Sequence, residues 1–85
     1  MAYEIYLERN AQKFLSKTSK DSRDKIIFTI QQLTDNPRPA GCKKLTGREA
    51  WRIRVSDYRI IYEIRDKELV ILVVDIGHRR EIYKR

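Results

Sequence analysis

The stretch 51-WRIRVSDYRIIYEI-64 predicts a β-hairpin and fixes the direction of its side chains. Apolar and polar residues alternate on both sides of residues 56–57, as in two strands that each bury one face. With a two-residue turn there, Arg54 faces Arg59, and Arg52 shares their side of the sheet, which we expect to be open. A one-residue slip would bury the arginines, so the pattern fixes the register. The opposite, packed face carries Trp51, Ile53, Val55, Tyr58, Ile60 and Tyr62.

The N-terminal half predicts one strand and two helices. Residues 3–7 alternate with period two, which indicates a strand. Residues 7–17 and 18–37 place apolar side chains at helical spacing, and Asn36-Pro37 ends the second segment. Ser19 or Asp21 can cap the second helix by accepting a backbone hydrogen bond.

The C-terminal half predicts three strands, at residues 51–55, 58–64 and 69–76, with a tight turn at Asp66-Lys67. The order is strand, helix, helix, strand, strand, strand. We therefore expect a single α+β domain over residues 1–85, in which a two-helix hairpin packs on one face of a mostly antiparallel four-stranded sheet.

Composition excludes several classes of protein. A hydrophobic content of 41% is too high for a disordered chain. No apolar run approaches the roughly 20 residues of a membrane helix, so no membrane partner is expected. One cysteine and one histidine exclude an internal disulfide and a zinc site. We expect no metal or cofactor, and the absence of a signal-peptide pattern makes a cytoplasmic location the default.

Positive charge is concentrated in the middle of the chain. The formal net charge is +7, and residues 38–59 contain seven basic side chains but only two acids. Such a patch indicates a nucleic acid or an acidic protein as partner, although an ordinary solvated surface is the alternative. Besides the hairpin arginines, the candidate RNA contacts are Arg38, Lys43, Lys44 and Arg48.

The hairpin arginines allow two interpretations. Like charges directly opposite each other are destabilising, so either nearby acids neutralise them or they form a site for phosphate, which guanidinium groups bind bidentately. His78, Glu81 and Tyr83 are the nearby groups that could transfer protons in phosphodiester cleavage. A tight turn before the last strand places His78 on the arginine side and Arg79 on the other, whereas one β-bulge reverses them.

Residues 36–83, NPRPAGCKKLTGREAWRIRVSDYRIIYEIRDKELVILVVDIGHRREIY, resemble the RelE/ParE superfamily of toxins from type II toxin–antitoxin systems. The most specific pieces are NPRP, KKLTG, the hairpin and IGHRREIY. The resemblance implies a RelE-like fold and an endoribonuclease that cuts mRNA in the ribosomal A site. In that reaction the 2′-hydroxyl attacks its neighbouring phosphate, without a metal. The family's basic and tyrosine positions correspond to Arg52, Arg54, Arg59, Arg79 and Tyr83.

One departure concerns proton transfer. RelE-type members carry lysines where this chain has Arg52 and Arg54, and an arginine does not serve as a base. His78 or Tyr83 would then take that part. The resemblance also implies a RelB-like antitoxin with an acidic or amphipathic segment, and contact with operator DNA only through that antitoxin. The alternatives are a ParE-type toxin that poisons gyrase and a basic RNA-binding module without catalysis.

Overall fold

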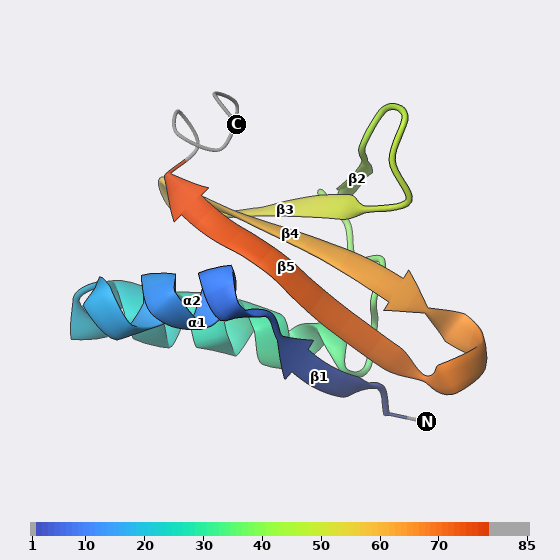
Figure 1. Cartoon of the computed structure of the whole chain (residues 1–85), viewed down its shortest axis with the longest axis horizontal. Helices are drawn as coiled ribbons and strands as arrows, with labels where there is room; N and C mark the ends of the chain where they lie inside the picture. The colour runs from blue at the N-terminus through green and yellow to red at the C-terminus, as the bar shows by residue number, and fades with distance from the viewer. Residues whose placement is uncertain (1, 79–85) are drawn as a thin grey trace.

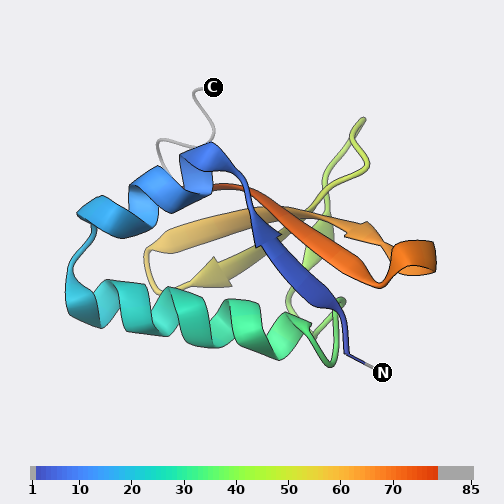
Figure 2. The ribbon, with the colours of Figure 1, turned by 60° about the horizontal axis from the view of Figure 1, so that its bottom comes forward.

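The computed structural model, which describes residues 2–78, contains a five-stranded sheet covered on one face by two helices (Figures 1 and 2). The sheet order is β1-β5-β4-β3-β2. The elements are β1 (Glu4–Leu7), α1 (Arg9–Lys17), α2 (Lys20–Leu33), β2 (Lys43–Lys44), β3 (Trp51–Val55), β4 (Tyr58–Arg65), a 3-10 turn (Asp66–Glu68) and β5 (Val70–His78).

The predicted α+β class and element order are confirmed, but the predicted four-stranded sheet is wrong. Lys43–Lys44 pairs antiparallel with β3 and adds a fifth strand, which two residues were too short to predict. β1 pairs parallel with β5, while the other three pairings are antiparallel. The parallel pairing is possible because the two helices carry the chain across the sheet between these strands.

The helices begin and end near the predicted residues. Ser19, not Asp21, is the N-cap of α2, and its hydroxyl accepts a hydrogen bond from the backbone N–H of Ser22 at 3.3 Å. Arg23 of α2 donates to the carbonyl oxygens of Leu15 and Thr18, at 2.8 and 3.1 Å. These bonds satisfy carbonyls at the end of α1 and hold the helical hairpin closed.

The main core lies between the helices and the sheet. Its fully buried large side chains are Ile26, Leu33, Ile60, Tyr62, Ile71, Val73 and Ile76. Tyr62 donates its hydroxyl to the carbonyl oxygen of Pro37 at 2.8 Å, which satisfies both polar groups. Burial raises the pKa of Tyr62 far above its usual range. No helix within residues 2–78 is long and apolar enough to cross a membrane.

The connection between β4 and β5 differs from the predicted two-residue turn. A 3-10 turn spans Asp66–Glu68, and Leu69 follows with a positive φ of 55°. β5 then continues through His78, beyond the predicted end at residue 76. Its pairing with β4 contains one irregularity, at Ile61/Tyr62, where Asp75 faces Ile61 and Val73 faces Tyr62. This bulge leaves Val74 as the extra residue and changes the side-chain alternation that follows.

Candidate functional site

The β3–β4 hairpin has the register that the sequence predicts. Val55 faces Tyr58 across a two-residue turn, and Trp51 faces Tyr62 at the other end. Ser56 adopts a positive φ of 56°, the left-handed conformation that glycine usually supplies in such turns. The hairpin therefore reaches its predicted register although neither residue of its turn is a glycine.

This register brings three arginines together as a group that we call the arginine cluster: Arg52, Arg54 and Arg59. Arg54 lies directly opposite Arg59, and Arg52 is two residues before Arg54 on the same face of β3. Opposed residues in an antiparallel pair have Cβ atoms about 5 Å apart. The guanidinium groups thus extend from neighbouring points on one side of the sheet.

The expectation that this face is open is wrong at Arg59. Arg54 is exposed and Arg52 is half-buried, but only 3% of Arg59 is exposed. Two features explain the difference. β4 is an inner strand between β3 and β5, and the same face carries a second, smaller apolar cluster around Ala50 and Ile61. Exposure within the arginine cluster therefore decreases from Arg54, on β3, to Arg59, on the inner strand β4.

Lys43, on β2, adds a further cation to the face that carries the arginine cluster. It lies opposite Arg52 in the β2–β3 pairing, which places its exposed side chain on the same face. The sequence indicated a general RNA contact here but not this position. The sequence did contain a signal for a hairpin between β2 and β3, because Gly47 permits a turn there. In the structure, Leu45 donates its N–H to the Ala50 carbonyl at 2.9 Å within this connection.

His78 lies on the opposite face from the arginine cluster. It pairs with Tyr58, whose side chain faces the helices, and the two rings are 4.8 Å apart between centroids. Of the two placements that the sequence left open, the structure has the one with a β-bulge: the extra residue Val74 turns His78 away from the arginines. Arg79 and Tyr83, the other predicted residues of this segment, lie outside residues 2–78.

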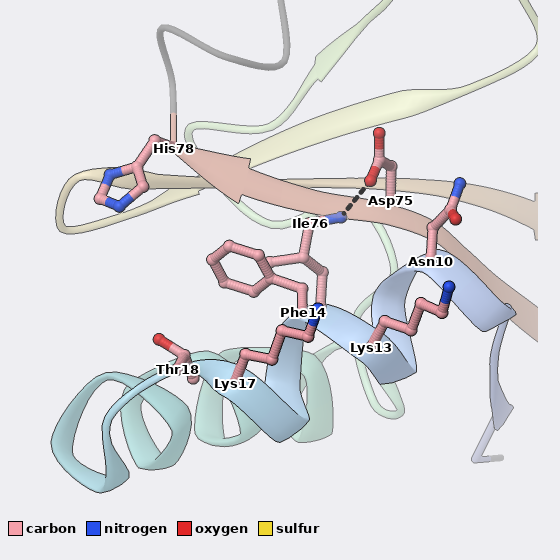
Figure 3. Close-up of a pocket in the computed structure, with 8 residues that line it drawn as sticks. All are labelled: Asn10, Lys13, Phe14, Lys17, Thr18, Asp75, Ile76 and His78. Atoms are coloured by element: carbon pink, nitrogen blue, oxygen red, sulfur yellow. Dashed lines mark hydrogen bonds between the residues drawn. The ribbon is translucent and has the colours of Figure 1, made fainter.

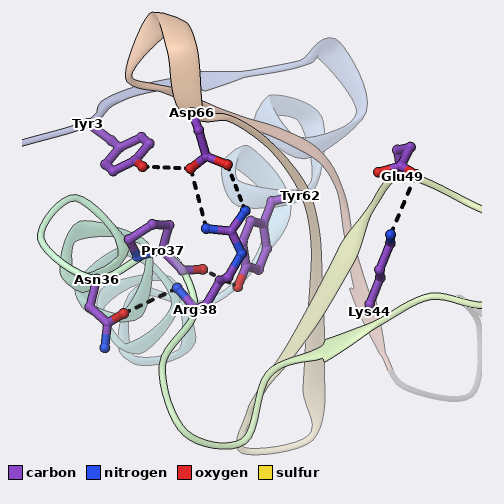
Figure 4. Close-up of polar contacts among 8 residues, drawn as sticks. All are labelled: Tyr3, Asn36, Pro37, Arg38, Lys44, Glu49, Tyr62 and Asp66. Atoms are coloured by element: carbon purple, nitrogen blue, oxygen red, sulfur yellow. Dashed lines mark hydrogen bonds and ion pairs between the residues drawn. The ribbon is translucent and has the colours of Figure 1, made fainter.

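Arg38 has a structural partner. Its guanidinium forms two hydrogen bonds to the Asp66 carboxylate, at 2.8 and 3.3 Å (Figure 4). The same group stacks 5.2 Å from the centroid of the Trp51 ring. Tyr3 donates to the same carboxylate at 2.7 Å. Hydrogen bonds from Arg38 and Tyr3 lower the pKa of Asp66. Because Trp51 faces the helix side, Arg38 is separated from the arginine cluster by the sheet.

The remaining predicted RNA contacts lie on the β2–β3 hairpin. Lys44 pairs with Trp51 on the helix side and lies 3.5 Å from Glu49, an exposed pair that contributes little to stability (Figure 4). Arg48 is exposed in the connecting loop. Of the four residues predicted as RNA contacts, the structure thus brings only Lys43 onto the face of the arginine cluster. Within residues 2–78, no three His, Cys, Asp or Glu side chains are grouped so as to hold a metal ion.

The arrangement suits an anion better than any other ligand. Arg54 and Lys43 are accessible, and Arg59 adds a cation in a water-poor position where its interaction with an anion is stronger. A phosphate on this face could receive several charge-assisted hydrogen bonds from opposite strands.

Known proteins are similar to this chain in sequence and fold over almost their whole length. Residues 5–83 match the family described as "ParE toxin of type II toxin-antitoxin system, parDE". The mRNA interferase toxin RelE of Escherichia coli K12 is 25% identical over 87 residues, covering 98% of this chain and 92% of the relative.

Two solved complexes contain chains with the same architecture. In the archaeal RelE–RelB complex from Pyrococcus horikoshii OT3, the matching chain is 26% identical with a TM-score of 0.82, covering 93% of this chain and 97% of that one. In the intact Escherichia coli RelBE toxin–antitoxin complex, the values are 25% identity and a TM-score of 0.79, with 91% and 96% covered.

Proposed function

Since the chain belongs to the RelE/ParE superfamily of toxins from type II toxin–antitoxin systems, we propose that it is an endoribonuclease that cuts mRNA in the ribosomal A site. The sequence resembles the RelE branch in its basic and tyrosine positions. The relative from Escherichia coli K12 carries the name mRNA interferase, which supports the same activity.

The observation that carries the proposal is that Arg54 lies directly opposite Arg59. Like-charged cross-strand neighbours cost free energy in a sheet, which favours a role for this pair in binding an anion. An anion placed between the two guanidinium groups removes the repulsion. The scissile phosphate of RNA carries one negative charge in the ground state and gains more in the transition state, where such donors stabilise it most.

The proposed reaction is a transesterification within the RNA. The 2′-hydroxyl loses its proton and forms a bond from O2′ to the adjacent phosphorus, while the bond from phosphorus to O5′ breaks and O5′ takes up a proton. The products are a 2′,3′-cyclic phosphate and a free 5′-hydroxyl. Arg54 and Arg59 stabilise the charge on the pentacoordinate phosphorus, and Arg52 and Lys43 hold the RNA backbone beside it.

Proton transfer falls to a different group. Arginine is protonated at any physiological pH and is unsuited to act as a base. The geometry removes His78 from this part, because its side chain lies on the helix side of the sheet. Tyr83 remains the proposed proton donor or acceptor, and Arg79 a further source of positive charge.

A chain with no strong base depends on alignment of its substrate. Positioning by the ribosome can supply several kcal/mol of the barrier, so we expect much faster cutting of ribosome-bound mRNA than of free RNA. The proposed partners are the ribosome, mRNA and a RelB-like antitoxin with an acidic or amphipathic segment, whose charge complements the net +7 of this chain. Operator DNA would be contacted through the antitoxin, and the site of action would be the cytoplasm.

Inducible expression followed by mapping of mRNA ends tests the proposal. Wild-type protein should produce new 5′-hydroxyl ends within translated codons, and Arg54→Ala should reduce them about 100-fold, the effect of losing one preorganised donor. Arg54 is the first choice because it is exposed, whereas replacing the buried Arg59 also perturbs folding. Arg65→Ala is the matched control, since Arg65 is an exposed arginine on the neighbouring strand β4.

The same cultures separate the alternatives. Induction of the SOS response without cut mRNA would assign the chain to the gyrase-poisoning branch, to which the matched ParE family model lends weight. Ribosome binding without cut mRNA would indicate the RNA-binding module. Either result contradicts the proposed nuclease.

A further inference from the structure

A groove of about 530 Å³ lies between α1 and the end of β5, on the helix side of the sheet (Figure 3). Asn10, Lys13 and Lys17 line it from α1, and Asp75 and His78 line it from β5. The proposed cleavage reaction makes no use of this groove.

Positive charge dominates the α1 side of the groove. Lys13 and Lys17 are both exposed and lie four residues apart, about 6 Å along the helix axis. The sequence of α1, RNAQKFLSK, contains no acid, and neither lysine forms an ion pair with another of residues 2–78. The one lining acid, Asp75, accepts a hydrogen bond from the backbone N–H of Ile76 at 2.9 Å. Two neighbouring cations thus remain available to a ligand.

Aromatic rings form the other part of the groove. Phe14 meets Tyr58 edge to face, with 5.6 Å between ring centroids, and Tyr58 supports the His78 ring at 4.8 Å. His78 is exposed, so one face of its imidazole is accessible above this row of rings. Cations beside an exposed aromatic ring are the combination by which proteins bind single-stranded RNA, since the cations contact phosphates and the ring stacks on a base.

The groove lies on the opposite face of the sheet from the arginine cluster. Gly77, which is buried, lies directly opposite Arg59 and is followed by His78, so the two surfaces are on opposite faces at neighbouring positions of β5. β1 borders β5 only at Val70–Val73, and no other strand within residues 2–78 flanks the edge beyond it.

We propose that this groove binds single-stranded RNA, with phosphates on Lys13 and Lys17 and a base stacked on His78. The inference rests on the proposed function in naming the substrate as single-stranded RNA. It adds a second binding surface, formed by α1 and the end of β5, to the arginine face.

The test measures binding of a fluorescent 2′-O-methyl RNA decamer, which has no free 2′-hydroxyl and stays intact, at several salt concentrations between 50 and 200 mM. Each lost phosphate contact to a single strand lowers the salt slope by about 0.7, so the Lys13→Ala/Lys17→Ala double variant should lower it by about 1.4. His78→Ala should weaken affinity about tenfold through lost stacking. The control is Lys25→Ala/Lys67→Ala, which removes the same charge from exposed sites outside the groove.

Equal slopes for the groove and control variants would overturn the proposal, as would no binding by the wild type at 50 mM salt. Unchanged RNA binding with weakened binding of an acidic antitoxin peptide would assign the groove to a protein partner and equally overturn it. Because the RNA cannot be cut, the result is independent of nuclease activity. A chain that binds RNA through the groove but cuts no mRNA would contradict the proposed function alone.

Discussion

Replacing Arg54 by glutamate should stabilise the fold while abolishing its proposed activity. In the wild type, two guanidinium groups oppose each other at Arg54 and Arg59, and Arg54→Glu converts this repulsion into an ion pair. A cross-strand charge pair contributes roughly 0.2–1 kcal/mol in either direction. Removing one unfavourable pair and creating one favourable pair gives about 1 kcal/mol, after allowance for the exposure of position 54. For a domain of this size, that gain corresponds to a rise in Tm of about 4–8 °C.

Urea unfolding at low and high salt measures the effect. The gain should shrink at 1 M NaCl, where the Debye length falls to about 3 Å. Arg65→Glu is the matched control, because Arg65 lies 3.1 Å from Glu63 and the same substitution there replaces an attraction with a repulsion. Arg65→Glu should therefore be neutral or destabilising. If Arg54→Glu lowered the free energy of unfolding at low salt, the arginine pair would not be the strained contact that the proposed site requires.

Three further predictions concern the surrounding fold. Tyr62→Phe should cost about 1–2 kcal/mol in urea unfolding, because it leaves the Pro37 carbonyl without its hydrogen bond. The pKa of Asp66 is lower in the folded state than its unfolded value of 3.8, so its contribution to stability is present above about pH 4 and lost as the pH falls through the folded pKa. Unfolding followed from pH 7 to pH 3 should accordingly show a smaller acid loss in Asp66→Asn, and an equal loss would contradict the Arg38 interaction. Ser56→Gly should raise stability by roughly 0.5 kcal/mol by relieving the positive φ, and a loss would show that the turn is unstrained.

The sequence predicts most of this fold because its strongest patterns are local. Alternation on both sides of residues 56–57 fixes the hairpin register, and the Asn36-Pro37 stop and the Ser19 cap bound the second helix. The fifth strand is not predicted by these local patterns, because Lys43–Lys44 is too short to show periodicity and forms a strand only by pairing with β3. Its formation is a tertiary effect.

The site is predicted less completely than the fold. Pairing of Arg54 with Arg59 follows from turn length, but burial of Arg59 depends on which strand lies beside β4. The position of His78 depends on a single bulge, 10 residues beyond the hairpin of residues 51–64 that the sequence fixes well. Arg38 resembled a free cation in sequence, and its partner Asp66 lies 28 residues away. Side-chain direction therefore follows from local pattern only until a bulge or a distant partner intervenes.

The central claim is that the Arg54–Arg59 pair stabilises the reacting phosphate. Cleavage of mRNA on purified ribosomes tests this claim most directly. The assay compares wild type, Arg54→Ala and Arg65→Ala at saturating ribosome concentration. The account predicts A-site cutting with 2′,3′-cyclic phosphate ends, a single-turnover rate about 100-fold lower for Arg54→Ala, and an unchanged rate for Arg65→Ala. Cutting by Arg54→Ala at the wild-type rate, or an equal loss of rate in Arg54→Ala and Arg65→Ala, would contradict it.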